Sequence, residues 1–576
     1  MKTLSSCSRH APALPLCMLA LSLSAAGCRN GGEGDGDPTE GGTGTDGDTE
    51  AVDVTGDDSD TEGTDSAGDA EVIPPPGGMR RLTPSQYVGS VEIILGDVAA
   101  AAAAPPPLPQ LGHFDTTTAN NEPLTPTDIE RYESSAMAIG TAVMSNSAQL
   151  NAKVPCVAAG QDPGCYEEVV SVIGRLAFRR PVTDAERTQL LDIANAGYEW
   201  GGNDFLTGIK YLVAAILQSP NFLYVVEVGE PTGVGDQRQL GDYELASRLS
   251  FFLLGHTPDT ALLDAAEGGQ LRTDDQIRST ALEMLSRPKA RERLSEFYDE
   301  LYRLRDLANK GKDAAMFPTF TPELAAAMRQ ETLLLIQNVV FEEESSFMGI
   351  FDANYTFVND DLAQLYGISP PAFPWQLVPL PVDQGRAGFL THPAFLTVFS
   401  HPNINSPTRR GLFVQEVLLC TDIQPPPPGV NAMPPSPAEG QTLREWMESQ
   451  HNVEPGCATC HGQMDPLGFA FERFSPIGGF RQLDNGQPID SSGDVGGLGS
   501  FGGANELASI LRNDPRTPNC VVRNLYRSTL GHDEGLDQAD GLALLEQAFT
   551  DSDFNYKVLM VELTVNPLFR LVDAPK

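Results

Sequence analysis

Helix-start signals recur along almost the whole chain beyond residue 80, and they restrict its fold more than any other feature. A Thr followed three residues later by Glu or Gln can cap the first turn of a helix reciprocally. Thr257-Pro258 and Thr321-Pro322 add a Thr directly before a Pro, which is favoured at the first helical position. Five segments match the first pattern: Thr83–Gln86, Thr127–Glu130, Thr183–Glu186, Thr273–Gln276 and Thr442–Glu445.

Strand signals are scarce by comparison. The clearest is Phe480–Asp490, which folds about Asn485-Gly486, a dipeptide that favours a tight hairpin turn. A chain of 576 residues is also too long for one hydrophobic core. The sequence therefore predicts a mainly α fold, with a multi-subdomain helical body and a small β-hairpin near the C-terminal part.

The N-terminus reads as an export signal. Lys2 and Arg9 precede an apolar stretch that is too short to span a bilayer. Ala25-Ala-Gly-Cys28 then resembles a bacterial lipobox, although Ala25 stands where Leu is commonest. We expect a lipoprotein signal peptide over residues 1–27 and lipidation of Cys28; an ordinary signal with an incidental cysteine is the alternative.

Residues 28–77 are composed mainly of Gly, Asp, Thr, Glu and Ser, and they predict a disordered acidic tether. The formal net charge of the chain is −40, which argues against nucleic acid and anionic membrane surfaces as partners. Membrane contact is therefore expected through the lipid anchor only. Arg29 follows the cysteine in place of an inner-membrane Asp signal, which favours an outer-membrane lipoprotein facing the periplasm or the medium.

Cys457-Ala-Thr-Cys-His461 has the C-x-x-C-H pattern of covalent haem attachment, in which two thiols bind the haem and the histidine ligates its iron. The expected cofactor is haem c, with His461 as the proximal ligand. Three alternatives stay open: a Cys457–Cys460 disulfide, a thiol redox pair, and a zinc site completed by His461 and His451.

The second axial ligand is less well specified. Met464 lies three residues after His461 and so on the same side of a helical turn, which excludes it from the opposite haem face. His451 and His401 flank the motif and are the preferred candidates; Met433, or no protein ligand, are alternatives.

Cysteine parity suggests two disulfides. The chain has 9 cysteines, of which two lie in the signal, one would carry lipid and two would hold haem. The four that are left allow three pairings. We expect Cys156–Cys165, closing a short loop, and Cys420–Cys520, tying the two sides of the motif together.

Two further groups near the motif are ambiguous. Glu472 and Arg473 either serve haem-propionate and hydrogen-bond roles or are solvated. His392 and His401 are predicted to lie in a loop held by local hydrogen bonds, with a polar pocket as the alternative. The sequence contains no G-x-S-x-G, H-E-x-x-H or P-loop motif.

Several strings along the chain form a recognisable series: Leu82–Tyr87, Ala177–Thr183, Leu217–Tyr224, Tyr243–Leu253, Arg386–Thr391 and Cys457–Glu472. Together they resemble a family of exported bacterial lipoproteins that is built from a fixed series of domains of unknown function, with a C-terminal cytochrome c-like module of the planctomycete type. His532 departs from the family's usual Arg after Gly531. The resemblance implies a surface-attached protein with a haem-like motif but supplies no substrate.

The expected organisation follows from these strings and from two proline connectors, at 101–110 and Pro425–Pro428. After the signal and the tether come helical domains over 78–155, 156–235 and 236–370, the C-x-x-C-H module over 380–490 and a helical domain over 491–576.

Two functions are open at this point. The first is a membrane-tethered c-type cytochrome-like protein that transfers electrons through one haem to an unknown redox partner. It becomes a haem-dependent oxidoreductase if the sixth iron position is open. The second is a non-catalytic cell-envelope binding or structural protein, with another envelope protein as partner, whose C-x-x-C is a disulfide.

Overall fold

The computed structural model describes residues 72–109, 112–159, 162, 164–424, 437–451 and 455–574. The predicted signal peptide, Cys28, all but the end of the predicted tether, Pro425–Pro428 and Met433 lie outside these residues. The side chain of His451 is also outside the described part.

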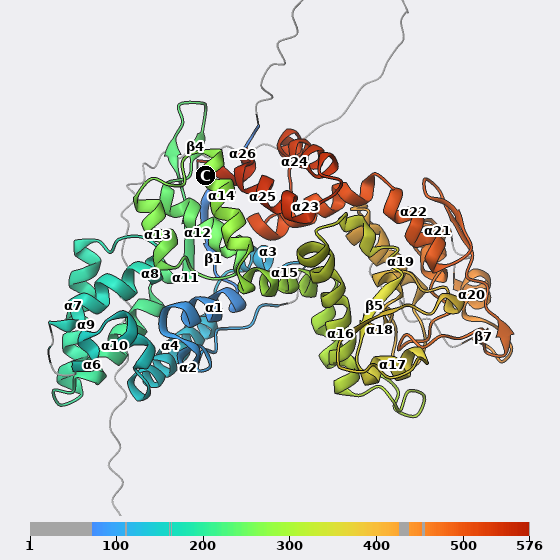
Figure 1. Cartoon of the computed structure of the whole chain (residues 1–576), viewed down its shortest axis with the longest axis horizontal. Helices are drawn as coiled ribbons and strands as arrows, with labels where there is room; N and C mark the ends of the chain where they lie inside the picture. Colours follow the sequence, from blue (N-terminus) through green and yellow to red (C-terminus); the bar gives the residue numbers. More distant parts are fainter. Residues whose placement is uncertain are drawn as a thin grey trace, which may run out of the picture. The chain divides into compact units, whose positions relative to one another are not determined.

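Helices dominate the described residues, and strands occur only as short pairs and one three-stranded sheet (Figure 1). The mainly α prediction is confirmed. No helix within the described ranges has both the length and the apolar character that crossing a bilayer requires.

The helices of the first part are α1 (Pro84–Leu95), α2 (Asp97–Ala100), α3 (Asp115–Asn121), α4 (Pro126–Ser145), α5 (Ala148–Lys153), α6 (Cys156–Ala159), α7 (Cys165–Val169), α8 (Arg175–Phe178), α9 (Asp184–Trp200), α10 (Phe205–Gln218) and α11 (Pro220–Leu223). The middle part contains α12 (Asp242–Leu253), α13 (Thr260–Glu267), α14 (Asp274–Leu285), α15 (Pro288–Leu301), α16 (Pro322–Gln337), α17 (Asp360–Tyr366), α18 (Pro393–Val398) and α19 (Pro407–Phe413). The last part contains α20 (Leu443–Trp446), α21 (Pro455–Phe469), α22 (Ala504–Asn513), α23 (Arg516–Leu530), α24 (Ala539–Asp551), α25 (Tyr556–Val565) and α26 (Pro567–Arg570).

The strands form antiparallel pairs. Non-local pairing joins β1 to β2 and β11 to β4, so chain ends meet segments far away in sequence. The strands are β1 (Gly78–Arg81), β2 (Tyr224–Glu227), β3 (Glu230–Pro231), β4 (Gln237–Gln239), β5 (Tyr355–Val358), β6 (Gln376–Pro379), β7 (Leu483–Asp484), β8 (Gln487–Pro488), β9 (Gly493–Val495), β10 (Gly499–Phe501) and β11 (Leu571–Asp573). The predicted hairpin is the β7–β8 pair, in which Asn485 and Gly486 both have positive φ, as the turn requires.

Most predicted helix caps are confirmed: Thr83, Thr183, Thr273, Thr321 and Thr442 each accept a hydrogen bond from the first turn of the following helix.

Two caps were predicted at the wrong residue. Helix α4 begins at Pro126, and its capping box pairs Thr125 with Asp128, because the proline favours the first helical position. Helix α13 is capped by Asp259 rather than Thr257. The hydroxyl of Thr257 is buried and donates instead to the Leu176 carbonyl at 2.8 Å.

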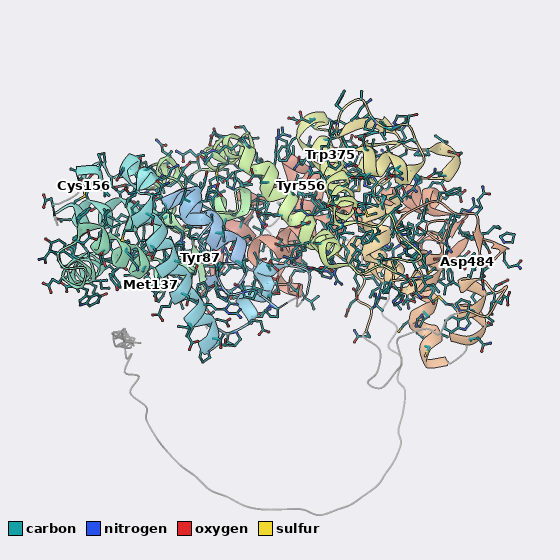
Figure 2. The ribbon with its side chains drawn as sticks, turned by 90° about the horizontal axis from the view of Figure 1, so that it is seen from below. Tyr87, Met137, Cys156, Trp375, Asp484 and Tyr556 are labelled. Atoms are coloured by element: carbon teal, nitrogen blue, oxygen red, sulfur yellow. A yellow bond between two sulfur atoms is a disulfide. The ribbon has the colours of Figure 1, made fainter. Side chains whose placement is uncertain are left out.

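Two large hydrophobic cores organise the described residues. One contains Tyr87 and extends from Leu82 to Val225, with Phe251 and Leu263 added. It therefore includes residues from both segments that the sequence separated at residue 155. The other contains Tyr556 and is formed mainly by residues 240–572. Figure 2 labels both tyrosines, and neither side chain is appreciably exposed.

A buried ion pair connects the two ends of the described chain. Glu227 on β2 contacts Arg80 on β1 and Arg248 on α12, each at 2.8 Å. Arg248 also donates to the Phe569 carbonyl of α26 at 2.7 Å. Burial alone would raise the pKa of Glu227, but the charges of Arg248 and Arg80 lower it well below its ordinary value. Two cations thus compensate the desolvation of one carboxylate.

Disulfides join Cys156 to Cys165 and Cys420 to Cys520, the two pairs that the sequence predicted. The first closes a loop of sequence separation 9 and the second one of 100. The second bond attaches the end of η7 (Val414–Leu418), which continues α19, to α23.

Candidate functional site

The C-x-x-C-H motif lies on helix α21. Cys457 and Cys460 are three residues apart on this helix, so their side chains project from the same side. Both are half-buried free thiols. The two cysteines therefore do not form the alternative Cys457–Cys460 disulfide in this structure.

His461 is held in position by a carboxylate one helical turn away. Its Nδ1 lies 2.9 Å from Oδ2 of Asp465, whose side chain is 1% exposed, while the His461 side chain is 17% exposed. The other oxygen of Asp465 accepts a hydrogen bond from the Thr408 hydroxyl of α19 at 2.7 Å. Because a carboxylate only accepts, Nδ1 carries the proton and Nε2 has the lone pair that can bind a metal.

Neither Asp465 nor Thr408 was predicted as a site residue. The spacing of four between His461 and Asp465 on one helix indicates such a contact and was the available signal. Thr408 could not be predicted in the same way, because its contact crosses from α19 to α21 over 57 residues of sequence.

The backbones of α19 and α21 lie close together, which brings the Thr408 hydroxyl within hydrogen-bonding distance of Asp465. A Cβ atom on Gly411 would clash with the carbonyl oxygen of Met464, and one on Gly468 would clash with that of Pro407. The two glycines therefore allow backbone to lie against backbone at both ends of the contact. The Gln415 amide adds a hydrogen bond to the Gln463 carbonyl at 3.0 Å.

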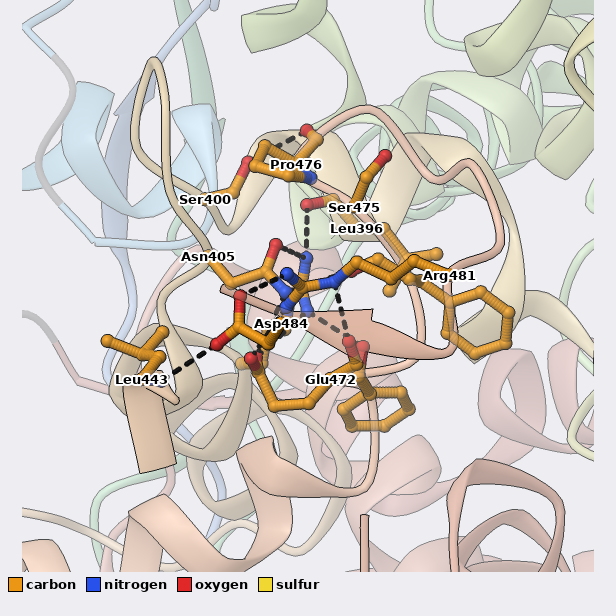
Figure 3. A network of polar contacts seen from close by, with 12 residues as sticks. Leu396, Ser400, Asn405, Leu443, Glu472, Ser475, Pro476, Arg481 and Asp484 are labelled. Atoms are coloured by element: carbon orange, nitrogen blue, oxygen red, sulfur yellow. Dashed lines mark hydrogen bonds and ion pairs between the residues drawn. The ribbon is translucent and has the colours of Figure 1, made fainter. Parts of the chain in front are cut away.

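A buried polar network fixes the segment that follows α21 (Figure 3). Glu472 accepts hydrogen bonds from Arg481 at 2.9 Å and from Asn405 at 3.0 Å. Arg481 also contacts Asp484 at 2.6 Å, and Asp484 accepts from the backbone N–H of Leu443, where α20 begins. The β7 strand, α20 and the end of α21 are therefore joined through charged side chains.

The same network gives Glu472 the expected hydrogen-bond role and excludes the solvated alternative. Its side chain is buried, with Arg410 3.8 Å away in addition to Arg481. Burial raises its pKa, and the two cations oppose this rise. Glu472 is thus neither solvated nor exposed toward a ligand, because a buried carboxylate needs these cations as partners. Arg473 is exposed.

His392 occupies a core position. Its Nδ1 is 3.0 Å from the Thr332 hydroxyl, and its Nε2 is 3.3 Å from that of Thr356. Burial, followed by the charge of Arg386, lowers its pKa to about 3. Glu331, 3.9 Å from the ring, has its pKa raised to about 7 by burial. His392 is therefore a neutral, hydrogen-bonded core histidine.

His401, a predicted distal ligand, lies in the turn before α19, where its backbone N–H donates to the Ile404 carbonyl at 2.9 Å. It is buried, and burial together with the charges of Arg409, Lys310 and Lys312 lowers its pKa to about 4. The structure thus places it within a cationic group. The prediction for His451 falls on a side chain outside the described residues.

Within the part of the chain that the structure describes, no group of three or more His, Cys, Asp or Glu side chains is arranged to hold a metal ion. The donor set on α21 consists of two thiols and one imidazole, which are the groups that covalent haem attachment requires.

Comparison with known proteins places three domain families on this chain. Each family is described as a protein of unknown function. Residues 165–227 match the family DUF1595, residues 240–368 match DUF1592, and residues 386–484 match DUF1588. The chain therefore carries a series of domains of unknown function. The third match includes α19, α21 and the C-x-x-C-H motif. No curated protein and no solved structure matches the chain.

The contact between α19 and α21 predicts opposite effects for two Gly→Ala changes. Gly411→Ala should lower the free energy of unfolding by about 1–3 kcal/mol, because the helices must separate to admit the methyl group. Gly462→Ala, on the same α21 but with no atom near its Cβ position, should raise it by about 0.5–1 kcal/mol. Urea unfolding of both variants measures this, and equal effects would contradict the described packing.

Proposed function

We propose that Cys457, Cys460 and His461 attach one haem c and that the protein is a membrane-tethered, c-type cytochrome-like electron-transfer protein. The observation that carries the proposal is the contact of His461 Nδ1 with buried Asp465. Metal-binding histidines commonly donate their second ring N–H to a carboxylate, which fixes the tautomer and the ring orientation.

The residues of α21 fit the proposed cofactor. The two half-buried thiols are free and one turn apart, so each is available for a thioether bond. Nε2 of His461 is the nitrogen that would ligate the iron, and Asp465, oriented by Thr408, makes the imidazole a stronger electron donor. When bound, the haem supplies one-electron chemistry, while the chain determines its potential and orientation.

The family that matches residues 386–484 also supports a cytochrome-like function. The family model that covers residues 386–484 carries the name PSCyt3, which suggests an association with cytochromes. The motif falls inside this match. The name concerns the family, and the assignment of haem to this chain is our proposal.

The location that we propose is the outer membrane, through lipid on Cys28, with the acidic segment as a spacer. Export would also place the motif where covalent haem attachment takes place in bacteria. The proposed partner is a redox protein of the envelope.

Covalent haem attachment should be lost when either the thiols or the ligand is removed. After co-expression with periplasmic haem-attachment machinery, the chain should stain for haem on a denaturing gel and give a pyridine haemochrome spectrum. Cys457→Ala and His461→Ala should each abolish the covalent signal, while Cys156→Ala should keep it. An unstained parent chain beside a matured control cytochrome would refute the proposal.

Asp465→Asn should raise the reduction potential of the haem-loaded protein, because a neutral amide makes His461 a weaker donor than the carboxylate does. Thr408→Val should change the potential by less, since it removes one hydrogen bond to Asp465 and leaves the carboxylate beside His461 in place. Spectroelectrochemical titration measures both. Unchanged potentials in variants that retain their haem would exclude Asp465 as the partner that tunes the ligand.

Lipid attachment is tested separately. Cells labelled with a palmitate analogue should yield labelled parent protein in the outer-membrane fraction and unlabelled Cys28→Ala protein. Cys17→Ala is the matched control and should be labelled normally. Labelling that persists in the Cys28→Ala protein would exclude this anchor.

A further inference from the structure

A partly enclosed cavity of about 330 Å³ lies beside α19, on a face that does not contact α21. Its walls come from the ends of α15 and α18, from α19 and from η7, and the apolar part includes Leu301, Phe399 and Phe413. This volume lies within the range of small-molecule sites, which are usually apolar with a few convergent polar groups.

Helix α19 and its continuation η7 separate this cavity from the C-x-x-C-H helix. Thr408, Gly411 and Gln415 contact α21 through the hydrogen bonds and close approach described above. Arg409 and Glu416, each one position further along, line the cavity instead. Since consecutive helical positions differ by about 100°, the cavity and the motif use adjacent faces of the same helix.

The polar groups of the cavity are mainly cationic. Arg303 is paired with Asp306 at 2.7 Å. Lys310 and Arg409, in contrast, form no side-chain hydrogen bond or ion pair with any described residue, and neither does Glu416, the carboxyl group in the lining. Arg409 is exposed and Lys310 is half-buried, so both cations remain accessible at the rim of the apolar cavity, and neither is directly paired with a described carboxylate.

Electrostatic repulsion among these groups supports this description. Burial, then the charges of Arg409 and Arg303, lowers the pKa of Lys310. Burial and Arg303 lower that of Arg409. Nearby Lys312 has its pKa lowered to about 7 by burial and by the charges of Lys310, Arg410 and Arg409. A cluster of mutually repelling cations in a chain of net charge −40 is where a bound anion would gain most.

We propose that this cavity binds a small organic carboxylate, with an aromatic or branched aliphatic body against Phe399 and Phe413 and the carboxylate group between Arg409 and Lys310. The apolar walls account for the body and the two cations for the acid group. Glu416 limits the affinity, because it places a like charge in the same lining. The proposal does not depend on the attachment of haem at Cys457 and Cys460.

The probe pair is 3-phenylpropionate and its neutral analogue 3-phenylpropan-1-ol, titrated calorimetrically into the full-length protein at neutral pH. We expect saturable binding of the acid at one site and binding of the alcohol at least tenfold weaker, because charge-assisted hydrogen bonds form only with the acid. Equal binding of acid and alcohol, or no saturable binding of the acid, would overturn the proposal.

Two substitutions, one removing a positive charge and one removing a negative charge, test whether the acid binds at this cavity. Arg409→Gln should weaken binding of the acid by roughly tenfold or more, and Glu416→Gln should strengthen it, since it removes a like charge. Arg473→Gln is the matched control, an equal charge change at an exposed residue outside the lining, and should leave the affinity unchanged. An unchanged affinity in the Arg409 variant would place the carboxylate elsewhere.

A second source of carboxylate is a haem propionate, and a comparison of preparations distinguishes the two. The protein expressed with and without haem-attachment machinery should bind 3-phenylpropionate equally well if the cavity takes a free acid. Binding that occurs only in the haem-free preparation would contradict our proposal and assign the cations to the haem. Failure of haem attachment itself leaves the titration of the acid unaffected.

Discussion

The contact between α19 and α21 is the interaction on which the candidate site depends. Gly411 and Gly468 let the two backbones touch, and this proximity brings Thr408 within hydrogen-bonding distance of Asp465. Asp465 in turn fixes the proton of His461 on Nδ1. The tautomer of His461 is therefore fixed within α21, and the two glycines let Thr408 of α19 orient the carboxylate that fixes it.

The surroundings hold that contact rigidly from both sides. The Cys420–Cys520 disulfide attaches the end of η7 to α23, and the network around Glu472 attaches the end of α21 to the hairpin and to α20. Sites that position a cofactor ligand need such support, because small displacements of a ligand change its chemistry. The buried charges near α21 therefore have a positioning role, and the exposed Arg473 does not share it.

Structures that depend on neighbouring residues were predicted well from the sequence, whereas contacts between residues far apart in the sequence were not. Caps such as Thr183 and the Asn485-Gly486 turn depend on neighbouring residues, so their patterns are readable. Thr257 failed because a distant carbonyl, that of Leu176, takes its hydroxyl. The partner of Glu472 and the lining of the cavity beside α19 were not predicted for the same reason. Asn405 reaches Glu472, and Lys310 lies in the same lining as Arg409, only after folding.

The central claim is that Cys457 and Cys460 both bind one haem that His461 ligates. Mass spectrometry of the tryptic peptide Glu445–Arg473, from protein matured with haem-attachment machinery and treated with a thiol-alkylating reagent, tests it most directly. We predict a peptide heavier by one haem, with neither cysteine alkylated. A peptide without added haem, with two alkylated cysteines or an internal disulfide, would contradict the account.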